Sequence, residues 1–286
     1  MYTLKIRNPA GEIFELTHNR TNYSVIHVSG LTPPKADINT SPAGSIDGTF
    51  YNSARANQRN IVITLVLEGD IEANRQNLYR IFPDKSLCTV FFKNENRDVQ
   101  IEGYVEVVEG DLFSKREQMQ ISIICPRTYW QALGVVSYEL STTLRQFEFP
   151  FSIAETPGVP LSSYDQYPQI HIYNDGSVQC GFTATIEIGG SITDLALYNL
   201  TTQQKLQLMS SVTLAAGDTV EISTMPGALH IRRISAGQTS NLINYLTSDS
   251  EFFGLAVGDN TLYYSASGDP DDVHVDISPV FQYGGV

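Results

Sequence analysis

Residues 59–130 constrain the fold of this chain most strongly, because the spacing of their apolar side chains changes from strand to helix and back. Arg59–Leu67 has apolar residues on both faces, which predicts a central, buried strand. Asp70 can cap a helix over residues 71–82, where apolar side chains recur at helical spacing until Pro83 ends the pattern. Three more strands are predicted at residues 87–92, 101–107 and 119–125. A single amphipathic helix among strands is typical of an α+β or β-sandwich domain.

The segment before this region is less regular. The chain begins with a predicted hairpin, whose alternating strands flank the turn Asn8-Pro9-Ala10-Gly11. Residues 29–58 are poor in large apolar side chains and rich in Pro, Gly, Ser and Asn. A compact domain rarely carries so long a connection unless the segment has a function or is mobile. A disordered surface loop and a functional segment therefore both stay open.

The C-terminal half contains short predicted strands at even spacing, with turns such as Asn174-Asp175-Gly176 and Ala216-Gly217-Asp218 between them. This pattern is typical of a β-sandwich or jelly roll. A stretch marked by prolines and glycines precedes it and indicates a crossing segment. We predict a mainly β protein with three parts. They are an N-terminal β-sandwich-like domain with one α-helix (residues 1–133), a linker (134–168) and a C-terminal β-sandwich (169–286).

Composition limits the possible partners and the compartment. The 286 residues carry a formal net charge of -13, which argues against a surface that grips phosphates, so no stable nucleic-acid binding is expected. We see no signal peptide and no apolar run of membrane-spanning length, so we expect a soluble protein folded in a cytoplasm, with no membrane partner. Cys88, Cys125 and Cys180 are scattered, which suggests a reducing compartment and thiols that pack as small hydrophobes.

Motifs for catalysis are absent from the sequence. It contains no nucleophile elbow, P-loop, dinucleotide fingerprint or zinc-protease helix. The histidines lack the near spacing of metal ligands, and structural roles are favoured for all of them: His18, His27, His171, His230 and His274.

Two acidic groups could carry chemistry. The first contains Asp269, Asp271, Asp272 and Asp276. Oxygen-rich loops can bind calcium, but this spacing is not that of an EF-hand, so an ordinary charged turn is favoured. The second contains Glu102, Glu106, Glu109 and Asp111. Paired carboxylates can serve a glycosidase, yet a run of exposed Glu is usually a solvated strand face.

The only tryptophan, Trp130, follows Tyr129 at the predicted exit from the first domain. An aromatic pair can stack on a sugar, but a plug that packs one domain on another is favoured at this position. We therefore predict that the chain is not an enzyme. No catalytic, cofactor-binding or metal-binding residue is assigned, and no cofactor is expected.

The order of these features resembles the distal tail protein family of siphophages. In the N-terminal half the resemblance rests on Arg59–Leu67, residues 78–83 (Leu-Tyr-Arg-Ile-Phe-Pro), Val105-x-x-x-Glu109 and residues 118–130, which end in Tyr-Trp. In the C-terminal half it rests on residues 172–176 (Ile-Tyr-Asn-Asp-Gly), Leu214-x-x-Gly217-Asp218 and residues 251–260. Together these motifs span most of the chain.

The resemblance implies a structural hub. In that family the N-terminal domain forms a homo-hexameric ring around a lumen, and a galectin-like or jelly-roll C-terminal domain faces outward. The implied partners are other copies of the chain, the major tail-tube protein, the tail-associated lysin or fibre hub, and a receptor-binding protein. The implied location is the virion tail tip, after assembly in the host cytoplasm. Residues 29–58 would then be an arm that grips a neighbour, and Glu102 and Glu106 would help to line a lumen that repels DNA.

Two alternatives remain. The chain could be a lectin-like host-recognition protein that binds carbohydrate through its C-terminal sandwich, since sandwiches of this kind serve both functions. A glycosidase that uses strand carboxylates is the third hypothesis. The hub is favoured because the resemblance includes the N-terminal domain, which a lectin would not need.

Overall fold

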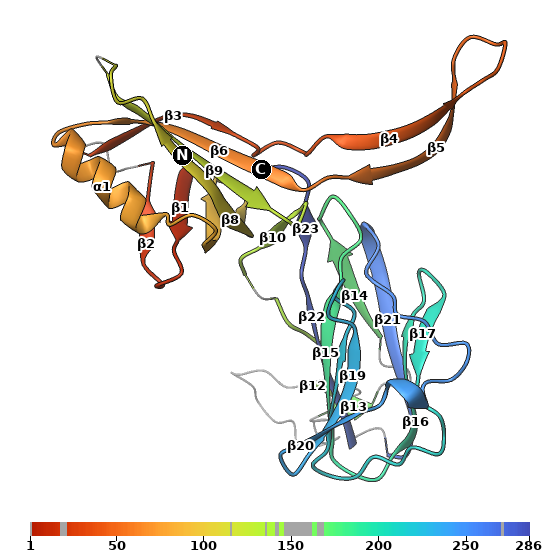
Figure 1. The fold of residues 1–286 in the computed structure, drawn as a ribbon. Coiled ribbons are helices and arrows are strands. Elements are labelled where there is room, and N and C mark those ends of the chain that lie inside the picture. Colours follow the sequence, from red (N-terminus) through yellow and green to blue (C-terminus); the bar gives the residue numbers. More distant parts are fainter. Residues whose placement is uncertain are drawn as a thin grey trace, which may run out of the picture. The chain divides into compact units, whose positions relative to one another are not determined.

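The computed structural model describes residues 2–17, 22–114, 116–134, 136–140, 143–145, 162–164, 169–269 and 272–286. The chain divides into two compact units (Figure 1). The N-terminal unit comprises Met1–Gly134 together with Gln282–Val286, and the C-terminal unit comprises Val135–Phe281. The last five residues thus belong to the N-terminal unit, whereas the sequence analysis placed them in the C-terminal domain. The reason is β-pairing: β23 (Gln282–Tyr283) pairs with β10 (Trp130–Ala132).

One antiparallel sheet forms the N-terminal unit. Its strand order is β2-β1-β7-β8-β9-β6-β3, and β10 pairs with the first part of β8. The strands are β1 (Thr3–Arg7), β2 (Ile13–Glu15), β3 (Tyr23–Ser29), β6 (Arg59–Leu67), β7 (Leu87–Lys93), β8 (Asp98–Gly110) and β9 (Gln118–Cys125). β8 and the start of β9 alternate between buried and exposed residues, as their sequence period predicts, whereas Ile121, Ser122 and Ile123 of β9 are all buried. β6 is buried on both faces only in its last three residues, and in its first six residues buried side chains alternate with exposed or half-buried ones.

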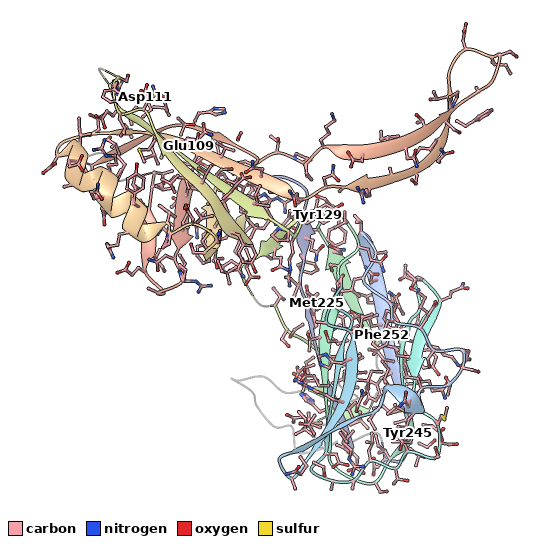
Figure 2. The ribbon with its side chains drawn as sticks, viewed as in Figure 1. Glu109, Asp111, Tyr129, Met225, Tyr245 and Phe252 are labelled. Carbon is pink, nitrogen blue, oxygen red and sulfur yellow. The ribbon has the colours of Figure 1, made fainter. Side chains whose placement is uncertain are left out.

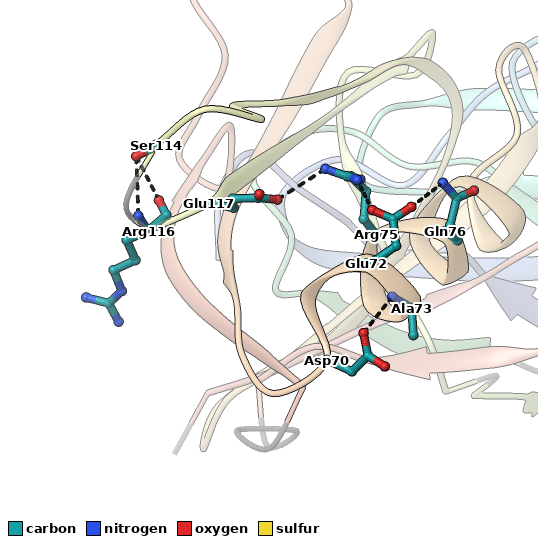
Figure 3. Close-up of polar contacts among 8 residues, drawn as sticks. All are labelled: Asp70, Glu72, Ala73, Arg75, Gln76, Ser114, Arg116 and Glu117. Atoms are coloured by element: carbon teal, nitrogen blue, oxygen red, sulfur yellow. Dashed lines mark hydrogen bonds and ion pairs between the residues drawn. The ribbon is translucent and has the colours of Figure 1, made fainter.

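The helix α1 (Ile71–Ile81) lies where the sequence predicted it. Asp70 caps it, with the Ala73 N–H donating to Asp70 Oδ1 at 3.1 Å (Figure 3). Leu78 and Ile81 are buried, so this face packs into the core of the unit. Arg75 ties the helix to the start of β9 through an ion pair with Glu117 at 3.2 Å.

Residues 29–58 contain a β-hairpin rather than an irregular loop. β4 (Ala36–Pro42) pairs with β5 (Thr49–Ala56) and with no other described strand. Figure 1 shows this hairpin extending away from the sheet of the N-terminal unit. We call residues 36–56 the arm. Almost every residue of the arm is exposed. The two strands therefore lack the alternation of apolar and polar residues from which a strand is predicted.

Two antiparallel sheets form the C-terminal unit. One has the order β11-β22-β15-β18-β19-β20 and the other β14-β21-β16-β17. The first contains β11 (Tyr138–Leu140), β15 (Phe182–Ile188), β18 (Thr219–Ser223), β19 (His230–Ser235), β20 (Gln238–Asn241) and β22 (Val273–Pro279). The second contains β14 (Gln169–Asn174), β16 (Thr193–Asn199), β17 (Gln204–Gln207) and β21 (Gly258–Ser267). A 3-10 turn, η1 (Ile243–Tyr245), precedes β21.

The two sheets share one apolar core. Ile186 and Val220 from the first sheet and Leu197 and Leu206 from the second line the same small interior space. This arrangement is a β-sandwich, so the prediction of a mainly β protein is confirmed. Much of the predicted linker lies outside the described residues. Of its described parts, β11 joins the sandwich, and β12 (Thr143–Arg145) pairs with β13 (Ser162–Tyr164).

Within the described part of the chain, no helix has the length and apolar character needed to cross a membrane.

Candidate assembly site

A buried arginine organises the base of the arm. Arg59 begins β6 and is only 2% exposed. Its guanidinium donates to backbone carbonyls of Thr32 (2.7 Å), Thr128 (3.0 Å), Gly284 (2.6 Å) and Gly30. Four oxygens thus replace the water that a buried cation loses, while burial lowers the pKa of the guanidinium.

This arrangement, the Arg59 node, ties three remote segments together. They are the segment that leads into the arm, the turn after β9 and the C-terminal residues. The guanidinium also lies 5.5 Å from the ring of Trp130, a distance suited to a cation–π contact. The base of the arm is therefore held firmly, although the arm itself is exposed.

The arm presents apolar side chains to solvent. Ile38, Ile46, Phe50 and Tyr51 are each more than 60% exposed. An isolated two-stranded hairpin is marginally stable in water, and unpaired strand edges with exposed apolar residues invite another chain. The arm therefore has the properties of an assembly element that a partner covers.

A polar face lies on β6, β8 and β9. The Ser122 hydroxyl donates to Glu106 Oε2 at 2.8 Å and lies 3.0 Å from Asn60 Oδ1. A β-bulge in β8 brings Glu106 to this position. Glu102 and Gln120 are exposed on the neighbouring stretches of β8 and β9. The surface is polar and acidic, as a solvated strand face would be.

Of the other two acidic residues in this group, Glu109 lies farther along β8 and Asp111 directly follows the strand. Figure 2 labels Glu109 and Asp111. They line a shallow depression together with Gln118 and Gln120. Both carboxylates are exposed to solvent beside an open depression, whereas the two carboxylates of a glycosidase flank the scissile bond of a bound sugar. The geometry gives no support to the glycosidase hypothesis.

The described histidines do not converge on a metal site. His171 Nδ1 lies 3.0 Å from the Thr261 hydroxyl, His230 Nε2 lies 3.0 Å from Glu221, and His274 Nε2 lies 3.4 Å from Asp276. His27 is exposed on β3, and His18 lies outside the described residues. No group of three metal-ligating side chains occurs among the residues that the structure describes.

The four aspartates predicted as a possible calcium-binding group (Asp269, Asp271, Asp272 and Asp276) lie near the start of β22 in the sequence. Asp272 packs against the turn Gly189-Gly190, where a Cβ on Gly190 would lie 1.9 Å from Asp272 Oδ2. The Gly189 N–H donates to the Asp272 carbonyl at 2.7 Å. Asp276 lies on β22, the Asp269 carbonyl accepts from the Asp272 N–H at 3.0 Å, and Asp271 lies outside the described residues. The side chain of Asp272 therefore fills space beside a glycine turn.

Trp130 is fully buried and cannot be a sugar-stacking platform. Its ring contacts Phe92 at 6.4 Å between centroids, in addition to Arg59, so its described contacts lie in the N-terminal unit. The three cysteines are free and buried, and burial raises the pKa of each thiol to about 12. They pack as small hydrophobes.

An ion pair between a buried aspartate and a half-buried arginine lies at the Leu214-x-x-Gly217-Asp218 motif of the C-terminal unit. Asp218 is 2% exposed and lies 2.6 Å from Arg233 Nη2, and it accepts from the Ala215 N–H at 2.7 Å. Burial alone would raise the pKa of this carboxyl, but these donors outweigh it and the pKa is lowered.

The assembly features escaped the sequence analysis in part. The Arg59 node draws on residues up to 225 positions apart, and no local pattern marks it. The one available signal was a charged residue at the start of an otherwise apolar strand.

Comparisons with known proteins find similarity to components of phage tails. Residues 175–278 match the family described as "Siphovirus-type tail component, C-terminal domain". The chain is similar to the Dit protein of phage SPP1, a hub of the adsorption apparatus in phages that infect Gram-positive bacteria, with a TM-score of 0.69 and 12% identity over 99% of both chains. It is also similar to a chain of the phage P2 baseplate in its activated conformation with Ca (TM-score 0.57, 12% identity, 100% of both chains) and with Sr (0.54, 11%, 100%). No curated protein matches.

The match assigns residues 175–278 to a family of siphovirus-type tail components, and the structural similarity shows a β-rich fold shared with a phage tail hub protein. More narrowly, the resemblance to the distal tail family is confirmed. Residues 175–278 carry the tail-component domain, and the whole chain has the distal tail fold.

Proposed function

We propose that this chain is the structural hub of a siphophage baseplate, forming a homo-hexameric ring and lacking enzymatic activity. The ring joins the tail tube to the tail-associated lysin or fibre hub and to receptor-binding components. The protein assembles in the host cytoplasm and is located at the tail tip of the virion. A galectin-like C-terminal unit faces outward in this arrangement.

The observation that carries this proposal is the arm. It exposes large apolar side chains and both strand edges, yet its base is fixed by the buried Arg59 node. A rigidly based, uncovered hairpin gains stability when a second chain covers it. The arm continues β3 and β6 at one edge of the sheet, and a neighbour that covers it with any surface other than its own arm makes a contact between unlike surfaces. Contacts between unlike surfaces close into rings when the rotation permits.

The polar face of β6, β8 and β9 fits the lumen of such a ring. Its acidic residues include Glu102 and Glu106, and a surface of this charge repels the DNA that passes through a tail. Measured ring-to-DNA affinity at low salt tests this assignment. Replacing both Glu residues with Gln should raise it, and unchanged affinity would place these carboxylates outside the lumen.

The proposal is tested by light scattering on the full chain, with negative-stain images of the same peak. We expect a ring of six copies with a central hole. A variant in which a short Gly-Ser turn replaces residues 36–56 should remain folded and monomeric. A wild-type chain that stays monomeric at high concentration would contradict the ring.

A second candidate is carbohydrate binding by the C-terminal unit. Tyr198 and Tyr263 are cross-strand partners whose ring centroids lie 5.5 Å apart, and Tyr173 on β14 is 62% exposed. Aromatic side chains on an open sheet can stack on sugar rings. Glycan-array binding by the full chain that Tyr263→Ala abolishes would favour this function.

A further inference from the structure

A pocket of about 280 Å³ lies at the opposite end of the N-terminal sheet from the arm. Phe91, Ile13 and Leu133 provide its apolar lining. Ile13 and Leu133 are 63% and 40% exposed, so the pocket leaves apolar surface uncovered. Its volume is at the lower limit for a small-molecule site, and suits a few side chains on a turn.

The charged lining of this pocket consists of two lysines, Lys5 and Lys93, and one acid, Asp98, on a chain with a net charge of -13. Lys5 pairs with Glu15 at 3.2 Å and Lys93 with Asp98 at 2.7 Å. Both lysine side chains are more than 40% exposed, and an ammonium group has three donors, so each can accept a further carboxylate. The pocket therefore suits an apolar side chain that is followed or preceded by an acid.

The tip of the arm has this composition. Ile46 is 71% exposed and the adjacent Asp47 is exposed. Gly44 and Gly48 flank them with φ of +69° and +111°, a conformation that favours glycine, and no atom lies within 4 Å of the Cβ that either would carry. The turn thus presents an exposed apolar side chain next to an exposed acidic one, between two glycines with open space around them.

Strand order places the tip and the pocket in a head-to-tail relation. The arm extends from β3 and β6, while the pocket spans β2, β1 and β7 at the other end of the order β2-β1-β7-β8-β9-β6-β3. A protomer with complementary features on opposite edges can repeat around a ring.

We infer that the arm tip of one protomer binds the pocket of the next, with Ile46 against Ile13, Phe91 and Leu133, and Asp47 beside Lys5 and Lys93. The occupant is a second copy of this chain. The inference rests on the proposed ring and names the surface that receives the arm.

Cysteine cross-linking of the full chain tests this contact. Ile46→Cys is combined with Leu133→Cys, and the matched control combines it with Leu112→Cys, an exposed leucine on the β8–β9 hairpin outside the pocket. The native cysteines are buried and will not compete. We expect mild oxidation to give covalent multimers up to the full ring for the Leu133 pair, reversed by reductant, and little product for the control.

The outcomes separate the two proposals. A ring that forms without selective cross-linking overturns the pocket contact and leaves the hub intact. Absence of any assembly, with no cross-link, overturns both. Equal cross-linking yields with Leu133→Cys and with Leu112→Cys would indicate random collision and would also overturn the contact.

Charge reversal gives an independent measure. Asp47→Lys and Lys93→Glu should each raise the protomer concentration needed for assembly by up to about fivefold per interface, since exposed ion pairs contribute little. The double variant should recover most of this loss. Additive losses in the double variant would show that the two side chains do not meet.

Discussion

Replacing Arg59 with leucine removes the donor that serves four backbone carbonyls at the base of the arm. Hydrogen bonds to a charged group contribute roughly 1.5–3 kcal/mol each, yet one substitution rarely costs more than about 5 kcal/mol. We therefore expect Arg59→Leu to lower the unfolding free energy of the N-terminal unit by about 3–5 kcal/mol. Arg59→Lys keeps the charge, but an ammonium group cannot reach carbonyls on several segments at once. This variant should therefore lower the unfolding free energy by about 2–3 kcal/mol.

Urea denaturation followed by tryptophan fluorescence measures this loss directly. Trp130 is the single tryptophan, is fully buried and lies beside Arg59, so its emission reports on the N-terminal unit. Arg127 is exposed and serves as the control, with an expected change below about 0.5 kcal/mol for Arg127→Leu. A loss below about 1 kcal/mol for Arg59→Leu would refute the view that this side chain holds the base of the arm.

Three further predictions follow from described contacts. Gly30→Ala should destabilise the N-terminal unit by at least about 2 kcal/mol in urea titrations, because φ is +84° and a Cβ would lie 2.0 Å from the Asn60 carbonyl oxygen. Gly44→Ala, where a Cβ would meet open space, should lower the unfolding free energy by only about 1 kcal/mol. Asp218 has a lowered pKa in the folded state, so its stabilisation is present above the unfolded value and is lost as pH falls through the folded value. Asp218→Asn should lower the unfolding free energy by about 1–3 kcal/mol at pH 7, and the urea midpoint of the variant should fall less steeply below pH 4 than that of the wild type. An equally steep fall in both proteins would contradict the pairing with Arg233. All three thiols should resist a thiol reagent at pH 8 until urea unfolds the chain, and rapid labelling of the native protein would contradict their burial.

The features that the sequence predicted are those with a local period. The alternation in β8 and β9 reflects one buried and one solvated face, and Asp70 before α1 is a local capping signal. The mainly β class follows from these repeated patterns.

The features that it did not predict depend on contacts between remote residues or on a partner. The arm has no buried face within one protomer, so its strands lack alternation and resemble a loop. The pairing of Gln282 with Gln131 joins segments that are far apart in the chain, and it moved the domain boundary. The pocket likewise collects residues from Thr3 to Leu133 that carry no common motif.

The pairing of β10 with β23 also has a mechanical consequence. The chain leaves the N-terminal unit after β10 and returns to it at β23, so the C-terminal unit is an insertion between two hydrogen-bonded strands. A force on that unit is divided between two covalent connections instead of one flexible linker. A pulling force on the C-terminal unit would therefore load both strands of this pair and would not peel the sheet from a single end. The same arrangement lets an unrelated module replace residues 135–281 while both ends of the joint stay anchored in the N-terminal unit.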